Sequence, residues 1–285
     1  MAAETYLPKI NIIQYLIKTI AHKMKRLQLK FKQSAAFIFS LLIISILSVS
    51  CSKDEEITPE EPPVEESTGS VPFYKLQRVE NLAAETDDKN PTVPKTEVLY
   101  SLENKTEQPL TFAKTSLWDL SFSGLYNSFL SGNNSANSLN TGYQGPGKGG
   151  IIVLEKSFDE VTDVPADSEF KTGKGLVGTD KAGAFGDGTG WYLYDFGGIL
   201  IGDGSEQKKH VAYAAGEPLK LKDGTTLSAR TIVLRTANGN IAKIKMISCY
   251  KDAFTADQWF KDTPHMYFTF EYVLVPKGST KFEIK

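Results

Sequence analysis

The sequence predicts an all-β domain built mainly from antiparallel sheets, with short strands, long loops and few helical turns. After residue 73, short runs rich in aromatic and β-branched residues recur, while helix-period patterns are scarce. Glycine, asparagine, aspartate and serine cluster between these runs, as they do in the turns of β proteins. No repeat with a period of roughly 20–50 residues is visible, so a propeller or a solenoid is not expected.

Seven runs are expected to be strands, and several of them alternate apolar and polar residues as a strand with one solvated face does. Asp223-Gly224 and Asn238-Gly239 lie between such runs and predict tight hairpin turns. Residues 254–261 form the one segment for which we expect a helix. The seven expected strands lie within residues 97–102, 117–122, 150–155, 190–195, 231–236, 242–248 and 267–275.

The first 50 residues are expected to form a signal region. A basic segment at residues 24–32 precedes an apolar run at residues 35–49, so Met24 is a better start than Met1. The apolar run is shorter than the roughly 20 residues of a membrane-spanning helix. This length favours the core of a signal peptide, and the alternative is an anchor that is never cleaved.

The apolar run ends at Cys51, which follows the small residue Ser50 and resembles the cysteine of a bacterial lipobox. We therefore expect Cys51 to carry acyl chains that attach the protein to the lipid bilayer. Residues 52–55, a serine, a lysine and two acids, resemble the export signal of Bacteroidetes lipoproteins that face the cell exterior. The simpler interpretation of these charges is the start of a solvated linker.

Residues 51–72 are acidic and rich in proline and are expected to be an extended tether. The globular domain is expected at residues 73–285, a length that can bury a core without disulfides. The chain has a net charge of −2 and an isoelectric point near 6.0. It has no basic patch interleaved with aromatic residues, so nucleic acid is not an expected partner.

Glycines at residues 142–150 satisfy a dinucleotide fingerprint and nearly spell a phosphate-binding loop. Both chemistries need a helix after the glycines, whereas the strand-like residues 151–154 follow here, so we interpret them as turn glycines. No Gly-x-Ser-x-Gly elbow or His-Glu-x-x-His helix is present. Cys249 lies in a strand-like run and is expected to be a packed small residue rather than a nucleophile. We expect no enzyme.

Several motifs, taken in order, resemble the HmuY-like family of surface lipoproteins of the Bacteroidetes. They begin with a Trp-Asp strand, a Gly-x-Gly-Lys-Gly-Gly turn and a Val-Pro segment, and continue to the end of the chain. The resemblance implies an all-β fold that clasps one planar ligand, haem, and passes it to a TonB-dependent haem transporter of the outer membrane. The matching segments are residues 118–122, 140–150, 158–165, 190–194, 235–245, 250–253 and 267–272.

The haem ligands known in the family are not found at the matching positions. Two histidines flank the Gly-Trp strand in the best-known members, but no histidine occurs between Pro165 and Trp191, and Phe196-Gly197 stands where the second would fall. Related members use methionines, and none occurs between Met24 and Met246.

His210 is the best candidate for the axial ligand, because many family members carry a histidine in this connection. His265, at the entrance of the last expected strand, is the second choice. A tyrosinate from Tyr192, Tyr194 or Tyr213 is a further alternative, and the spacing selects none of them. A surface histidine in a basic loop is the simpler interpretation of His210.

Two hypotheses therefore remain open. In the first, the chain is a haem-binding lipoprotein of the outer-membrane surface that hands haem to a transporter. In the second, it is a lipoprotein of the same fold that has lost its haem ligands and binds another ligand or acts as an accessory subunit.

The leader makes location the first testable property. The change Cys51→Ala should prevent acylation, so the protein should no longer label with a radioactive fatty acid or fractionate with membranes. The double change Lys53→Ala and Asp54→Ala should leave the protein acylated but facing the periplasm. Proteolysis of intact cells reads this out, and equal digestion of the wild type and the double variant would contradict export to the surface.

Overall fold

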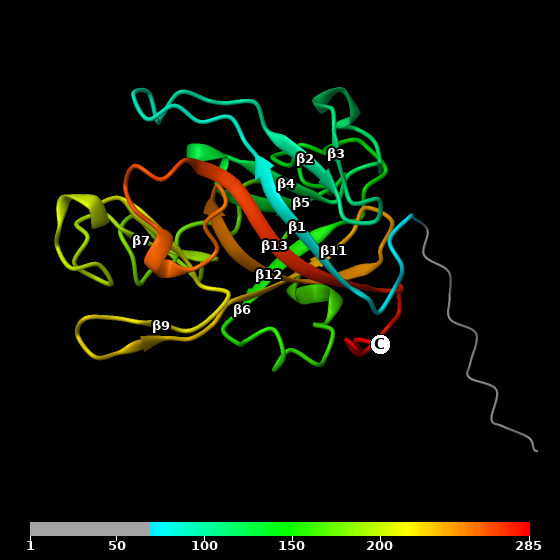
Figure 1. Ribbon diagram of the computed structural model, residues 1–285. Coiled ribbons are helices and arrows are strands. Elements are labelled where there is room, and N and C mark those ends of the chain that lie inside the picture. Colours follow the sequence, from blue (N-terminus) through cyan, green and yellow to red (C-terminus); the bar gives the residue numbers. More distant parts are fainter. Residues whose placement is uncertain (1–68) are drawn as a thin grey trace, which may run out of the picture. The chain divides into compact units, whose positions relative to one another are not determined.

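The computed structural model describes residues 69–285, and this part of the chain is a mainly antiparallel β domain (Figure 1). Its strands form two larger sheets and two small ones of two strands each. The predicted all-β fold is therefore confirmed. The expected signal region, Cys51 and the expected tether up to residue 68 lie outside the described residues.

The larger sheet has five strands in the order β1-β13-β12-β11-β6, and each neighbouring pair is antiparallel. Strands β1 and β13 are the first and the last strand of the domain, and they lie side by side in the sheet. The two longest strands, β12 and β13, run through its middle. The bounds are Leu76–Ala83 for β1, Gly150–Leu154 for β6, Thr231–Arg235 for β11, Ile241–Tyr250 for β12 and His265–Val275 for β13.

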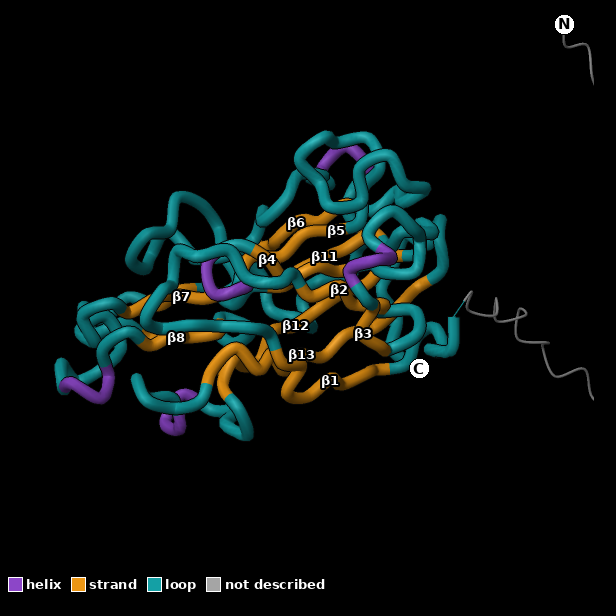
Figure 2. The backbone as a smooth tube through the Cα atoms, turned by 90° about the horizontal axis from the view of Figure 1, so that it is seen from above, coloured by secondary structure: helices purple, strands orange, loops and turns teal. Residues whose placement is uncertain are grey.

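The second sheet has four antiparallel strands in the order β3-β2-β4-β5 (Figure 2). Strand β7 pairs with β8 and strand β9 with β10, each as an antiparallel ribbon. The bounds are Val98–Ser101 for β2, Thr106–Gln108 for β3, Leu120–Ser123 for β4, Phe129–Gly132 for β5, Tyr192–Asp195 for β7, Val211–Ala214 for β8, Leu219–Lys220 for β9 and Thr226–Leu227 for β10. The described part of the chain also contains five 3-10 turns. They lie at Leu110–Phe112, Leu125–Asn127, Asp167–Glu169, Glu206–Lys208 and Ala256–Gln258.

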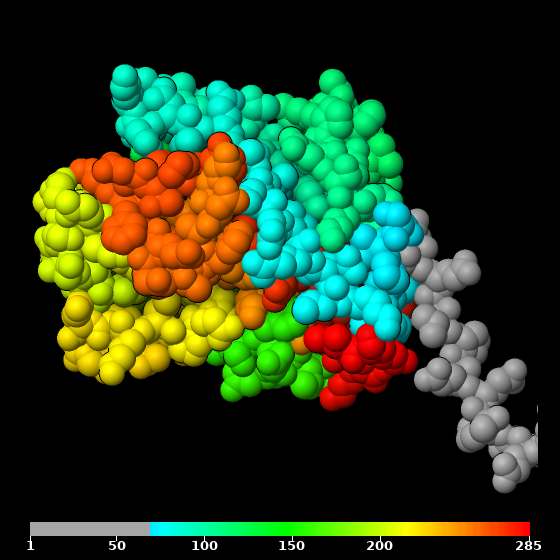
Figure 3. Space-filling model, viewed as in Figure 1, coloured from blue at the N-terminus to red at the C-terminus, as the bar shows by residue number. Residues whose placement is uncertain are grey.

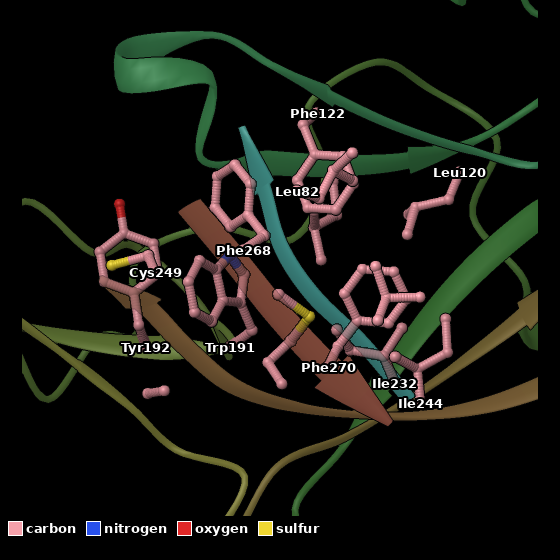
Figure 4. Packing of buried hydrophobic residues seen from close by; sticks show 14 of the residues in the cluster. Leu82, Leu120, Phe122, Trp191, Tyr192, Ile232, Ile244, Cys249, Phe268 and Phe270 are labelled. Atoms are coloured by element: carbon pink, nitrogen blue, oxygen red, sulfur yellow. The ribbon is translucent and has the colours of Figure 1, made fainter. Parts of the chain in front are cut away.

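The main core lies between the two larger sheets and is rich in aromatic rings (Figure 4). Phe122 of β4 stacks on Phe268 of β13 with 4.4 Å between the ring centroids. Tyr100 of β2 meets Phe270 of β13 edge to face at 5.8 Å. Trp191 closes one end of this core with its ring 6.0 Å from that of Phe268. Aromatic pairs of this kind add to the free energy of area burial.

The other face of the five-stranded sheet carries a smaller core. Val273 and Val275 of β13 point to this side and pack with Phe158 and Phe282. The Lys243 ammonium is buried here, donates hydrogen bonds to the carbonyl oxygens of Phe158 and Val161, and lies 4.2 Å from the Phe158 ring centroid. Two carbonyls and a ring face replace the water that the cation loses, so the charge is tolerated inside.

All seven expected strands are present, and both expected hairpin turns are confirmed. Gly224 joins β9 to β10 with φ +89°, and Gly239 joins β11 to β12 with φ +99°. Residues other than glycine rarely adopt such backbone angles, which is why glycine is found at both turns.

The helix expected at residues 254–261 is wrong, because only a 3-10 turn at Ala256–Gln258 forms there. Thr255 and Gln258 make a reciprocal capping box that starts the turn. Trp259 then leaves the helical region at φ −91°, ψ 119°, and its indole N–H donates to the carbonyl oxygen of Ala253 at 3.0 Å. Burial of the Trp259 ring against Tyr250 therefore ends the helix after one turn.

Two buried carboxylates join the second sheet to the β11–β12 hairpin. Asp119 accepts the backbone N–H of Leu102 at 2.8 Å and that of Ala237 at 3.0 Å. Glu103 accepts hydrogen bonds from side chains of the hairpin, namely Thr236, Asn238 and Asn240. Burial, and secondarily the Glu103 charge, raises the pKa of Asp119 to about 7.

From the raised pKa of Asp119 we predict that the free energy of unfolding of the domain falls as the pH rises above 5. The folded-state pKa of Asp119 lies above its unfolded value, so its contribution is complete below pH ~4 and is lost through pH ~7. We expect the free energy of unfolding to fall by roughly 2–3 kcal/mol between pH 5 and pH 8 from this group. Denaturant unfolding at the two pH values measures it.

The matched variants are Asp119→Asn, which removes the titrating group, and Asp223→Asn in an exposed turn. The pKa of Asp223 is held below its ordinary value by its hydrogen bonds to Thr225, so this group stays ionised over the range. Only Asp119→Asn should flatten the pH dependence. Glu103→Gln removes the neighbouring charge and should reduce the slope. An unchanged slope in both of these variants would contradict the assignment.

Candidate functional site

His210 stands at the entrance of β8, at the end of the loop that joins β7 to β8. Its backbone is left-handed at φ +59°, and its N–H donates to the carbonyl oxygen of Phe196 at 3.2 Å. This bond continues the β7–β8 pairing beyond Asp195 and Val211. The side chain of His210 is exposed, but its backbone is held by the end of β7.

Four rings lie together at this end of the domain and are called the aromatic patch: Phe185, Tyr194, Phe196 and His210. The Phe196 and His210 rings meet edge to face with 4.7 Å between their centroids, and Phe185 meets Phe196 at 5.6 Å and Tyr194 at 6.1 Å. Phe185 is 78% exposed and Phe196 49%. Large rings are usually covered in a monomeric domain, so this exposed group is the candidate for a binding surface.

The Tyr194 hydroxyl and Nδ1 of His210 are 2.9 Å apart and share one hydrogen bond. When Nδ1–H donates to the phenol oxygen, Nε2 keeps its lone pair for a ligand, as second-shell partners of metal-bound histidines commonly arrange. No hydrogen bond is made by Nε2 among residues 69–285. Burial raises the pKa of Tyr194 to about 12, with smaller contributions from Tyr126, Tyr192 and Asp88. The phenol is therefore protonated at neutral pH.

The patch continues along the loop that follows β7. Ile199, in this loop, is 67% exposed. A shallow hollow next to it is lined by Ile199, Gly202, Asp203, Gly204 and Lys222. The hollow thus combines the apolar side chain of Ile199 with the charged side chains of Asp203 and Lys222.

The other tyrosine candidates do not belong to the patch. Tyr194 pairs with Ala212 across the ribbon, whereas Tyr213 pairs with Leu193 and so points to the opposite face. Tyr213 is buried against Trp259, and burial raises its pKa to about 12. The Tyr192 hydroxyl is buried between Ser128 and Thr179.

His265 lies at the start of β13, and each of its ring nitrogens already forms a hydrogen bond with an oxygen atom. Its Nε2 is 2.9 Å from the Asp88 carboxylate, and its Nδ1 is 3.2 Å from the carbonyl oxygen of Thr263. The ring packs edge-on against Tyr126 and Tyr250. His265 could bind iron only by giving up one of these bonds, whereas His210 needs to give up none.

The glycine-rich residues 142–150 form turns that pack around Asn133 and then enter β6. A Cβ atom added to Gly142 or Gly147 would lie 2.1 or 2.3 Å from the Asn133 amide oxygen, which is too close. The Asn133 amide also donates to the carbonyl oxygens of Thr115 and Trp118. Glycine is needed here for close approach, so these are turn glycines, as the sequence predicted.

Other reactive groups are scarce in the described part of the chain. Cys249 is buried in the main core without a disulfide partner, and burial raises the pKa of its thiol to about 12, so it is a packed residue as expected. Within residues 69–285, no group of three or more His, Cys, Asp or Glu side chains is arranged so that it could hold a metal ion. None of the helical turns there is long and apolar enough to cross a membrane.

Sequence reasoning picked out His210 and Tyr194 as separate candidates and missed that they form a pair. It also missed Phe185 as part of the site. The available signal was position: Phe196 follows the β7 strand directly, and Phe185 lies in a polar, glycine-rich segment where a buried ring is not expected.

No protein-family model matches this chain, and no curated protein matches it as a relative.

Proposed function

We propose that this domain binds haem at the aromatic patch and that the whole protein is a lipid-anchored protein of the outer-membrane surface. In this role it would pass haem to a TonB-dependent transporter. One observation carries the proposal: an exposed aromatic patch surrounds a histidine with a free ring nitrogen. The nitrogen is Nε2 of His210, which has no hydrogen-bond partner in the described domain. The resemblance in the sequence supports the choice of haem as the ligand.

The residues of the patch fit one face of a haem. A haem site needs an apolar surface for the macrocycle and a side-chain donor for the iron, which acts as a Lewis acid when bound. Phe185 and Phe196 offer the apolar surface. His210 offers an imidazole nitrogen, and Tyr194 either orients that imidazole or offers its own oxygen as the donor. These residues would supply one side-chain donor for the iron.

The position of the patch suits transfer to a partner. Strand β7 lies at one end of the domain, while the first described residues and the C-terminus lie at the other (Figures 1 and 2). The same separation is visible on the surface, where segments near residue 200 and the first described residues occupy opposite ends (Figure 3). The patch therefore lies at the end of the domain away from residue 69, which in the proposed role leaves it free to meet a transporter.

A second candidate function is an accessory lipoprotein of the same fold that binds another planar, apolar ligand. The observation that favours it is the single free imidazole, since His265 is engaged by Asp88 and Thr263 and lies outside the patch. Such a protein would use the same rings without iron coordination. The two functions differ in whether a metal-free porphyrin binds as well as haemin does.

The change His210→Ala should weaken haemin binding at least tenfold, about 1.4 kcal/mol, because it removes the free axial donor. It should also alter the visible bands that report the iron's ligand field. Absorbance titration of the purified domain with haemin measures both. Tyr194→Phe keeps the ring and removes the hydroxyl. If the imidazole is the donor to iron, this change should weaken haemin binding less than His210→Ala does. If the phenol oxygen is the donor, it should weaken haemin binding more.

His265→Ala is the matched control, since it removes the other histidine of the domain and should leave haemin binding nearly unchanged. Phe196→Ser removes apolar surface but no candidate donor to iron, so it should weaken the binding of haemin and of metal-free protoporphyrin alike. Wild-type affinity no tighter than that of an unrelated β domain would reject the haem function. Equal affinity for haemin and the metal-free porphyrin, insensitive to His210→Ala, would favour the accessory lipoprotein.

A further inference from the structure

The loop that carries the patch beyond β7 is built around one buried carboxylate. Asp195, the last residue of β7, is fully buried. Its two oxygens accept the backbone N–H groups of four successive residues, Ile199, Leu200, Ile201 and Gly202, at 2.9 to 3.1 Å. The side chain therefore reaches forward into the loop and fixes the direction of the backbone at residues 199–202.

Backbone N–H groups take the place of a cationic partner for Asp195. No lysine or arginine of the described domain forms an ion pair with it, although its carboxylate lies away from water. Successive N–H groups that converge on one point make a concavity that suits an anion. Here the anion is a side chain of the same segment, so the loop conformation depends on this carboxylate.

Further contacts close the loop onto the residues before His210. Gly198 is left-handed at φ +68°, and its carbonyl oxygen accepts the N–H of Gly204 at 2.7 Å. A Cβ atom at Gly198 would lie 2.8 Å from the backbone carbonyl carbon and oxygen of Lys208. The loop thus sits directly against the chain that leads into His210, while its apolar side chains Phe196 and Ile199 stay exposed.

We infer that Asp195 is a positioning residue for the ligand surface, because it holds residues 199–202 and thereby keeps the loop after Phe196 preformed, with Phe196 and Ile199 exposed. A loose loop would fold these apolar side chains back onto the domain, and a ligand would then have to order the loop as it binds. A preformed loop avoids that cost, which is how rigid binding surfaces gain affinity. The inference rests on the proposed function for its ligand but not for the state of the loop.

The state of the loop is tested without any ligand, through amide hydrogen exchange of the purified domain. In Asp195→Asn an amide NH₂ replaces one acceptor oxygen and faces N–H donors, so the amides of residues 199–202 should exchange at least about tenfold faster. Gly198→Ala disturbs the same loop from another contact and should have the same effect. Asp203→Asn is the control, because this exposed side chain accepts hydrogen bonds from Ser205 and none from residues 199–202. Exchange at residues 199–202 that is unchanged in Asp195→Asn would overturn the inference.

The positioning role is tested by haemin binding in a double-mutant cycle. Asp195→Asn should weaken binding about tenfold in the wild-type background. In a background carrying Phe196→Ser and Ile199→Ser, the same change should cost less than about twofold, because the side chains that it positions are gone. An equal loss in both backgrounds would show general damage and would overturn the inference.

The two readouts separate this inference from the proposed function. A wild-type domain that binds no haemin would reject the haem function and the ligand part of the inference, and the exchange experiment would still decide whether Asp195 holds the loop. Tight haemin binding together with an additive cycle would keep the haem function and reject the role of Asp195.

Discussion

Strand β13 is the element on which the rest of the structure depends, because it is packed on both faces. Phe268, Phe270 and Tyr272 point to the second sheet, and the Tyr272 hydroxyl donates to the carbonyl oxygen of Leu102 at 2.8 Å. Val273 and Val275 point the other way into the smaller core. Each of these side chains is fully buried, worth roughly 1.5–3 kcal/mol of transfer free energy. The strand thereby contributes side chains to both hydrophobic cores of the domain.

The sequence predicts the strands with the longest aromatic and β-branched runs and misses six others, among them β5 and β8, which are buried but only four residues long. Residues 267–275 are nearly all apolar or aromatic, which is typical of a strand buried on both faces, and they form most of β13. Strand β1 was missed because its polar residues obscure the pattern and a bulge between Val79 and Leu82 breaks the alternation. Strands β3, β9 and β10 have two or three residues each, too few to show a period.

The candidate site was only partly predictable, for a physical reason. His210 could be chosen by its order along the chain, but the ring contacts that give it a setting come from three separate segments, at Phe185, at Tyr194 and Phe196, and at His210 itself. Those contacts depend on the left-handed backbone of Phe185 and His210, which no local pattern signals. The raised pKa of Asp119 was hidden likewise, since it depends on burial beside Glu103.

The patch is a direct continuation of the core, and this explains how exposed rings can hold fixed positions. The Trp191 indole N–H donates to the carbonyl oxygen of Ser128 at 2.7 Å, and its ring is buried just before β7 begins. Three residues later Tyr194 reaches the surface, and Asp195 then turns inward to hold the loop beyond it. A single strand thus carries core packing at its start and side chains of the aromatic patch at its end. Because the core fixes one end of β7 and the buried carboxylate fixes the other, substitutions at the exposed rings can change the surface of the patch without changing the fold.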